Sequence, residues 1–195
     1  MNTLRKNPIL IAVILLIVAA IAAHIYFNTD LLDRVAQTSE TPQARTERIL
    51  NEQRKQVVDD RGYFTTLIPQ SWVTQTPEPQ GTTLSSLIAT TDDFATNEEG
   101  VITAGAHFEI SARDTAPAGL PTLNLLENFN TRLGDETVEL SVYRSADGSG
   151  LTLITQTSRG NTHYEILMRY NAGAYLEGEQ IFLNILHSTL LTPKN

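Results

Sequence analysis

The amino-acid sequence predicts an α+β fold, a mostly antiparallel sheet with packed helices, preceded by one N-terminal transmembrane helix. Three observations lead to this prediction. A long apolar run occupies residues 8–27. Short segments of alternating apolar and polar residues recur between 61 and 170, which is typical of strands joined by tight turns. Two further segments, 121–133 and 177–190, place apolar residues on one face at helical spacing.

The apolar run is the first element. Residues 8–27 contain no charge, and a helix of this length reaches about 30 Å, the thickness of the hydrocarbon core of a bilayer. Small residues at Ala19, Ala20, Ala22 and Ala23 also fit a signal-peptidase site, so cleavage is the alternative. Tyr26 and Phe27 extend the run to spanning length and suit an interfacial anchor, which favours a retained signal anchor.

The charges around this run predict its orientation. Arg5 and Lys6 are the only charged residues before it, whereas 12 basic and 22 acidic residues follow it, a net charge of −10. Basic residues on a short flank remain in the cytoplasm, so residues 1–7 are expected to be cytoplasmic and the C-terminal domain to lie outside the cytoplasm. An acidic domain repels nucleic acid and anionic lipid, so neither is an expected partner.

Cysteine is absent from the sequence. Disulfide bonds, thiolate nucleophiles, thiolate metal sites and lipidation at cysteine are therefore excluded. Since extracytoplasmic domains of eukaryotes more often carry disulfides, a bacterial or archaeal protein is favoured.

Residues 28–60 are expected to form a partly helical stalk between the membrane and the domain. Thr41 and Pro42 supply a capping hydroxyl and a proline at the first helical position, and residues 45–58 contain no helix breaker. The apolar stripe of this helix is thin. A solvated spacer is therefore favoured over a coiled coil or a docking helix.

Residues 61–195 are expected to form the extracytoplasmic domain. It begins with alternating segments that predict strands at 63–68, 73–76, 82–89 and 101–111. A helix is predicted from Pro121 to Leu133, with Gly134 as its C-terminal stop, because four apolar residues fall on one face. These four residues are Leu125, Leu126, Phe129 and Leu133.

The rest of the domain is predicted as a meander closed by a helix. Turn residues at 147–150 and 159–161 separate strands expected at 137–144, 151–157 and 163–170, so these strands must pair antiparallel. A last helix at about 177–190 carries one apolar stripe and should cover the sheet.

The segment from Gly62-Tyr63-Phe64 to Ile68-Pro69-Gln70-Ser71-Trp72 resembles the opening of the PsbP/Mog1-like domain. The predicted element order and the segment 181–190 are similar too, so the resemblance covers residues 61 to about 191. Ile68 departs from it, since a tyrosine is common there. The resemblance implies a protein-binding or accessory domain rather than an enzyme. The residues themselves indicate a structural role, with Pro69 ending a strand and Trp72 folding back onto the core.

Two copies of a histidine, aromatic, glutamate pattern form the one candidate metal site. They are His107-Phe108-Glu109 and His163-Tyr164-Glu165, each inside a predicted strand. Strand alternation places both polar members of each copy on one face, so neighbouring strands could gather two imidazoles and two carboxylates around a divalent ion such as zinc. An ordinary solvated sheet face is the favoured alternative.

No motif indicates a catalytic site. Gly148-Ser149-Gly150 lies in a hairpin turn rather than a nucleophile elbow, and the pairs Asp92-Asp93 and Glu98-Glu99 lie in a predicted loop. We therefore expect a non-enzymatic, membrane-anchored accessory domain without a resident cofactor, which binds another protein or an envelope component. The alternative is a metal- or small-ligand-binding sensor or chaperone module that uses the His107/His163 face, and a hydrolase is a third class.

Overall fold

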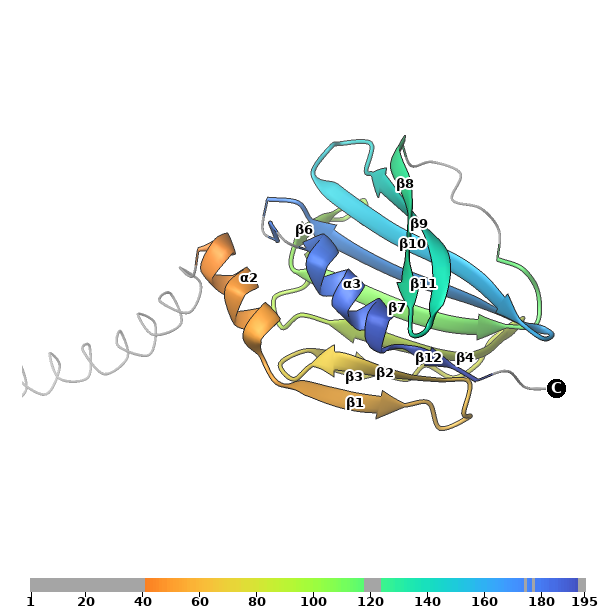
Figure 1. The fold of residues 1–195 in the computed structure, drawn as a ribbon. Coiled ribbons are helices and arrows are strands. Elements are labelled where there is room, and N and C mark those ends of the chain that lie inside the picture. Colours follow the sequence, from red (N-terminus) through yellow and green to blue (C-terminus); the bar gives the residue numbers. More distant parts are fainter. Residues whose placement is uncertain (1–40, 118–123, 174, 177, 193–195) are drawn as a thin grey trace, which may run out of the picture. The chain divides into compact units, whose positions relative to one another are not determined.

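The computed structural model describes residues 41–117, 124–173, 175–176 and 178–192 (Figure 1). The predicted membrane segment at 8–27 and the stalk before residue 41 lie outside the described residues. Within the part that the structure describes, no helix has the length and apolar character needed to cross a membrane.

A seven-stranded sheet forms the larger part of the domain, and all its neighbouring strands are antiparallel. This confirms the mostly antiparallel sheet that the sequence predicts. In spatial order, the strands are β3 (Val73–Gln75), β4 (Thr83–Thr90), β7 (Ala106–Arg113), β11 (Thr162–Asn171), β10 (Gly150–Arg159), β9 (Glu136–Arg144) and β8 (Asn124–Leu133).

The remaining described strands form a smaller sheet and a hairpin. The small sheet has the order β1 (Arg54–Val58), β2 (Phe64–Pro69), β12 (Leu190–Leu191). Alternate residues of β2 point into the core, because Phe64, Thr66 and Ile68 are all buried. The hairpin pairs β5 (Ala95–Thr96) with β6 (Ile102–Ala104).

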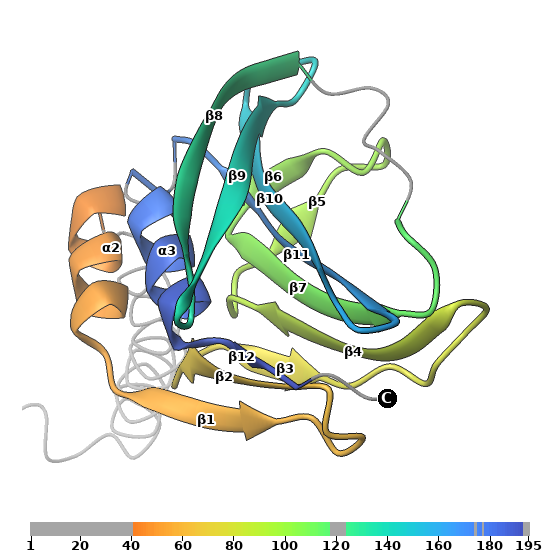
Figure 2. The same cartoon turned by 45° about the vertical axis from the view of Figure 1, so that its right-hand side comes forward.

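In the described part of the chain, two helices accompany the sheets, α2 (Pro42–Asn51) and α3 (Gly178–Ser188). The apolar stripe of α3 packs against β2 and β8, and its Phe182 ring lies 6.2 Å from the Phe108 ring of β7. Figures 1 and 2 show α3 between the curved end of the large sheet and the small sheet. Trp72 is 1% exposed in this core, so its structural role is confirmed.

The predicted helix at 121–133 is wrong for the residues that the structure describes. Asn124–Leu133 form β8, which pairs antiparallel with β9. Leu125, Phe129 and Leu133 are spaced by four residues, which fits one face of a helix and also one face of a regular strand. Pairing with β9 decides between the two. In β8, the bulge between Leu125 and Glu127 turns Leu125 to the opposite face from Phe129.

The predicted helix at 45–58 is also wrong in its second half. The helix begins at Pro42, as the capping pattern indicates, but it ends at Asn51, and Arg54–Val58 pair with β2 as β1. Lys55 Nζ also donates to the Trp72 carbonyl at 2.5 Å. The sheet therefore begins before residue 61, where the sequence analysis places the start of the domain.

The single strand predicted at 101–111 is divided in two. Gly105 lies between β6 and β7 with a φ of +73°, a left-handed conformation that ends one strand before the next begins. A side chain at this position would overlap the backbone of Phe94. The last helix ends at Ser188 rather than near 190, because Leu190 joins β12.

Candidate functional site

The two histidine-glutamate pairs lie on neighbouring strands, but the register separates them. β7 and β11 are hydrogen-bonded partners, and His163 lies opposite Arg113, six residues along β7 from His107. At about 3.4 Å per residue, this offset is about 20 Å. All four predicted residues share one sheet face, yet they do not converge. Among the described residues, no group of three or more potential ligands could hold a metal ion.

His107 pairs with Glu109 on its own strand. His107 Nε2 lies 3.6 Å from Glu109 Oε2, and the Phe94 ring lies 5.4 Å from the imidazole. Hydrogen bonding to His107 is the main cause that holds the pKa of Glu109 below its ordinary value of 4.5, although 3.6 Å is long for such a bond. Burial opposes this shift, and the positive charge of Arg169 assists it.

His163 and Glu165 find their partners on the adjacent strands. Ser158 Oγ of β10 lies 2.8 Å from His163 Nδ1. Glu165, which is 9% exposed, accepts a hydrogen bond from Gln156 Nε2 at 2.7 Å and lies 3.6 Å from Arg113 Nη2. The polar groups of this face thus neutralise one another across β7, β11 and β10.

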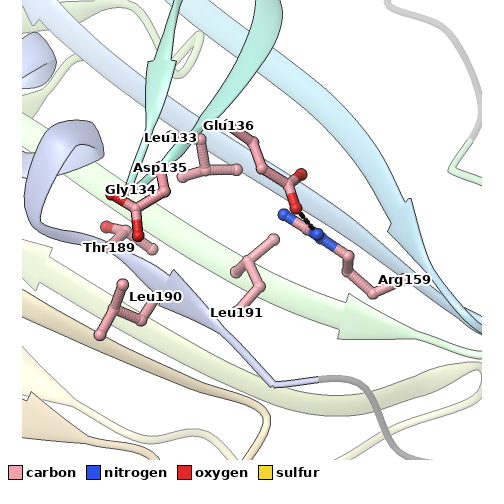
Figure 3. Close-up of a pocket in the computed structure, with 8 residues that line it drawn as sticks. All are labelled: Leu133, Gly134, Asp135, Glu136, Arg159, Thr189, Leu190 and Leu191. Atoms are coloured by element: carbon pink, nitrogen blue, oxygen red, sulfur yellow. Dashed lines mark ion pairs between the residues drawn. The ribbon is translucent and has the colours of Figure 1, made fainter.

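A pocket of about 170 Å³ lies where the β8–β9 turn meets β10 and β12 (Figure 3). Three segments that are far apart in the sequence form it. Its lining residues are Leu133, Gly134, Asp135, Glu136, Arg159, Thr189, Leu190 and Leu191.

An ion pair and a backbone contact shape this pocket. Arg159 Nη1 pairs with Glu136, as the dashed line in Figure 3 marks. Gly134 N–H donates to the Leu186 carbonyl at 3.1 Å, and an added side chain at Gly134 would approach Thr189 O to 2.8 Å. Arg159 Nε is buried without a hydrogen-bond partner in the described part of the chain. The surface of the pocket is therefore mainly polar, and the Arg159–Glu136 ion pair is part of it.

The sequence analysis did not find this pocket, because none of its residues forms a motif. Arg159 appears only as part of a turn, and Glu136 only as a residue before a strand. The juxtaposition depends on the docking of the β8–β9 turn on the end of α3. Local sequence patterns carry no signal for such a contact.

A second surface feature is the β8 edge of the large sheet, with which no other described strand pairs. β8 is the outermost strand, and its first five residues, Asn124–Asn128, are exposed. Leu125 and Leu126 are 51% and 48% exposed. The register with β9 shifts between Leu125 and Glu127, so Leu126 is the extra residue of a β-bulge.

Comparisons with known proteins bear on the fold. No family model matches the chain, and no curated protein sequence matches it. The structure is similar to the Ran-binding protein Mog1p of Saccharomyces cerevisiae, with a TM-score of 0.47 and 11% identity, covering 72% of this chain and 96% of that chain. For a variant of protein Mog1, the TM-score is 0.46 and the identity 12%, covering 71% and 96%.

A crystal structure of a protein from Bacteroides thetaiotaomicron is similar as well, with a TM-score of 0.43 and 14% identity over 72% of this chain. This chain spans about half, 49%, of the length of that protein. Structures of the Mog1 type, which the opening motif at 62–72 resembles, are thus among the similar ones. At this level of similarity, no partner or activity is transferred.

Proposed function

We propose that this protein is a single-pass membrane protein whose acidic α+β domain is held outside the cytoplasm and binds another protein or an envelope component. One observation carries the proposal. Residues 8–27 form an uncharged apolar run that follows Arg5 and Lys6, whereas the residues after the run carry a net charge of −10. This arrangement is the one that the positive-inside rule associates with a cytoplasmic N-terminus.

An accessory, binding role is supported by the way polar groups are used on the sheet face. The carboxylates of Glu109 and Glu165 each lie 3.6 Å from a cationic or protonatable partner, His107 and Arg113 respectively. The Arg113–Glu165 pair links β7 to β11, whereas His107 and Glu109 lie on the same strand. By contrast, apolar side chains are exposed at the edge of the sheet, where a partner can cover them.

The membrane part of the proposal is tested by interrupting the apolar run. Arginine at both Leu15 and Leu16 places charge at the centre of the segment, at about 2.5–3.5 kcal/mol per residue. We expect this variant to leave the carbonate-resistant membrane fraction, whereas the matched Leu15→Ala, Leu16→Ala variant stays.

Topology is tested with a reporter fused after Asn195. Alkaline phosphatase, which folds only outside the cytoplasm, should be active in the parent fusion and inactive in the double-arginine fusion. Activity in both fusions, or a parent protein that carbonate extracts, would contradict the anchor. Crosslinking of the full-length protein in its native membrane then tests for a partner.

A further inference from the structure

The strand at the edge of the large sheet is unusual for its length and exposure. β8 has 10 residues, whereas the edge strands β3, β1 and β12 have 3, 5 and 2. Among the described residues, β8 pairs with β9 on one side and with nothing on the other. An exposed strand edge carries a row of unpaired N–H and C=O groups, which is a template for another strand.

Only the first half of this edge is open. In the second half, Thr131 Oγ1 lies 3.5 Å from His187 Nε2, and the following turn is bonded to α3 through Gly134. Asn124–Asn128 are exposed at every position. Figure 2 shows this N-terminal end of β8 pointing away from α3.

Apolar side chains accompany the open backbone. Leu125 lies opposite Tyr143 in the register, so both side chains share a face, and Leu126 follows within the bulge. Leu125 and Leu126 are each about half exposed. A free backbone edge beside exposed apolar side chains suits recognition by strand addition, in which main-chain hydrogen bonds supply affinity and side-chain contacts supply specificity.

A second copy of this chain is a poor occupant. Two copies would each bring an acidic domain, with a net charge of −8 over residues 61–195, to the interface, and like charges oppose close association. Near the open edge, the charges of Glu127 on β8 and Arg144 opposite Asn124 balance. The acidic charge of the rest of the domain therefore favours a partner segment with a net positive charge.

We propose that the outer edge of β8 at Asn124–Asn128 binds an extended segment of a different protein by strand addition. The segment carries apolar residues that cover Leu125 and Leu126, and it has a net positive charge. This inference rests on the proposed binding function and names its surface and the chemistry of its partner.

The test uses the full-length protein in its native membrane, with the photoreactive residue p-benzoylphenylalanine as the probe. The probe is placed at Leu126 and, separately, at Asn128. Val73 of β3 and Val58 of β1, which are 51% and 58% exposed, receive the same probe as controls on other edges. Adducts are digested, and the linked residues are identified by mass spectrometry.

Strand addition has a specific signature in this experiment. Moving the probe by two residues along β8 must move the linked position by two residues along the same partner segment, and that segment must be net positive. With the probe at Leu126, Leu125→Lys should lower the adduct yield by at least about ten-fold, equivalent to 1.4 kcal/mol of affinity. The matched Val73→Lys variant should leave the yield unchanged.

Four outcomes overturn the proposal, and they separate it from the proposed function. Adducts with a second copy of this chain would assign the edge to self-association. Linked positions that do not move in step, or that lie in an acidic segment, would exclude strand addition. Adducts at Val58 or Val73 alone would keep the binding function and remove β8 from it. No adduct from any position would count against both.

Discussion

The Asp59 carboxylate joins the two sheets, and its removal tests how they are held together. Asp59 follows β1 and is 5% exposed. Its Oδ1 accepts a hydrogen bond at 2.5 Å from Ser85 Oγ of β4, in the large sheet. Its Oδ2 accepts one at 2.8 Å from the Tyr63 backbone N–H, at the start of the small sheet's second strand. One side chain thus connects two elements of different sheets.

Asp59→Ala leaves the Ser85 hydroxyl and the Tyr63 amide without their acceptor. A hydrogen bond to a charged group contributes about 1.5–3 kcal/mol, and a buried donor left unpaired keeps its desolvation penalty. Because both bonds share one carboxylate, their losses are not additive. We expect the free energy of unfolding to fall by about 3–5 kcal/mol. Asp59→Asn should lose less, since its amide can accept from one donor and donate to the serine oxygen.

The assay is urea unfolding of the full-length protein in mild detergent, followed by the fluorescence of Trp72. This is the only tryptophan in the chain, and it is 1% exposed, so its emission reports loss of the core. Asp60→Ala is the matched control, because Asp60 is the next residue and is exposed. It should change the free energy of unfolding by less than about 0.5 kcal/mol. If the two alanine variants differ by less than about 1 kcal/mol, Asp59 does not join the sheets as argued.

Three further predictions use the same unfolding assay. A left-handed backbone costs a non-glycine residue about 1–2 kcal/mol. Gly105→Ala should lower the free energy of unfolding by more than this, because the added methyl group would overlap the backbone of Phe94. Gly81→Ala, with a φ of +59° and open space, isolates the strain, and equal losses would refute the overlap. Tyr164→Phe should lower the free energy of unfolding by about 1 kcal/mol, since the hydroxyl donates to Thr192 O at 2.8 Å; an unchanged stability would count against that bond. Glu109→Gln should lower stability at pH 7, because the lowered pKa of Glu109 makes its ionised form stabilising above 4.5. The difference from the parent should vanish as the pH falls below 4.5 through the lowered pKa, and a pH-independent difference would contradict this account.

Strands that pair with a sequence neighbour through a tight turn were predictable. The expected strands at 151–157 and 163–170 correspond to β10 and β11, which extend a few residues further at their ends. The turn between them contains Gly160 with a φ of +56°, the conformation that a two-residue hairpin turn requires. Here local turn chemistry and alternation indicate the same structure.

Elements that depend on a distant partner were not predictable. In β1, Val57 is the apolar residue that packs against the core, and the sequence of this strand is equally compatible with the end of a solvated helix. Its strand conformation comes from the ladder with β2, in which Val57 lies opposite Thr66. The propensity of five residues is too small to oppose a helix that precedes them.

The candidate metal site likewise depends on strand adjacency and register, which the sequence does not predict. The pattern at His107 and His163 correctly predicts that each histidine and its glutamate share a face. Adjacency of β7 and β11 does not follow from sequence, and neither does the six-residue offset that pairs His163 with Arg113. Register is set by the whole sheet, because a shift along one strand moves every cross-strand pair.

The segment that the sequence predicts wrongly is also the segment proposed to bind a partner, and the two facts have one cause. A strand inside a sheet must alternate, because one face is buried. Asn124–Asn128 are exposed at every position, so folding imposes no alternation on them, and two adjacent leucines satisfy the helical pattern instead. A sequence shaped by folding alone would carry polar residues at exposed positions of a long edge. Leu125 and Leu126 depart from that rule without serving the core, and such a departure is expected where a surface binds.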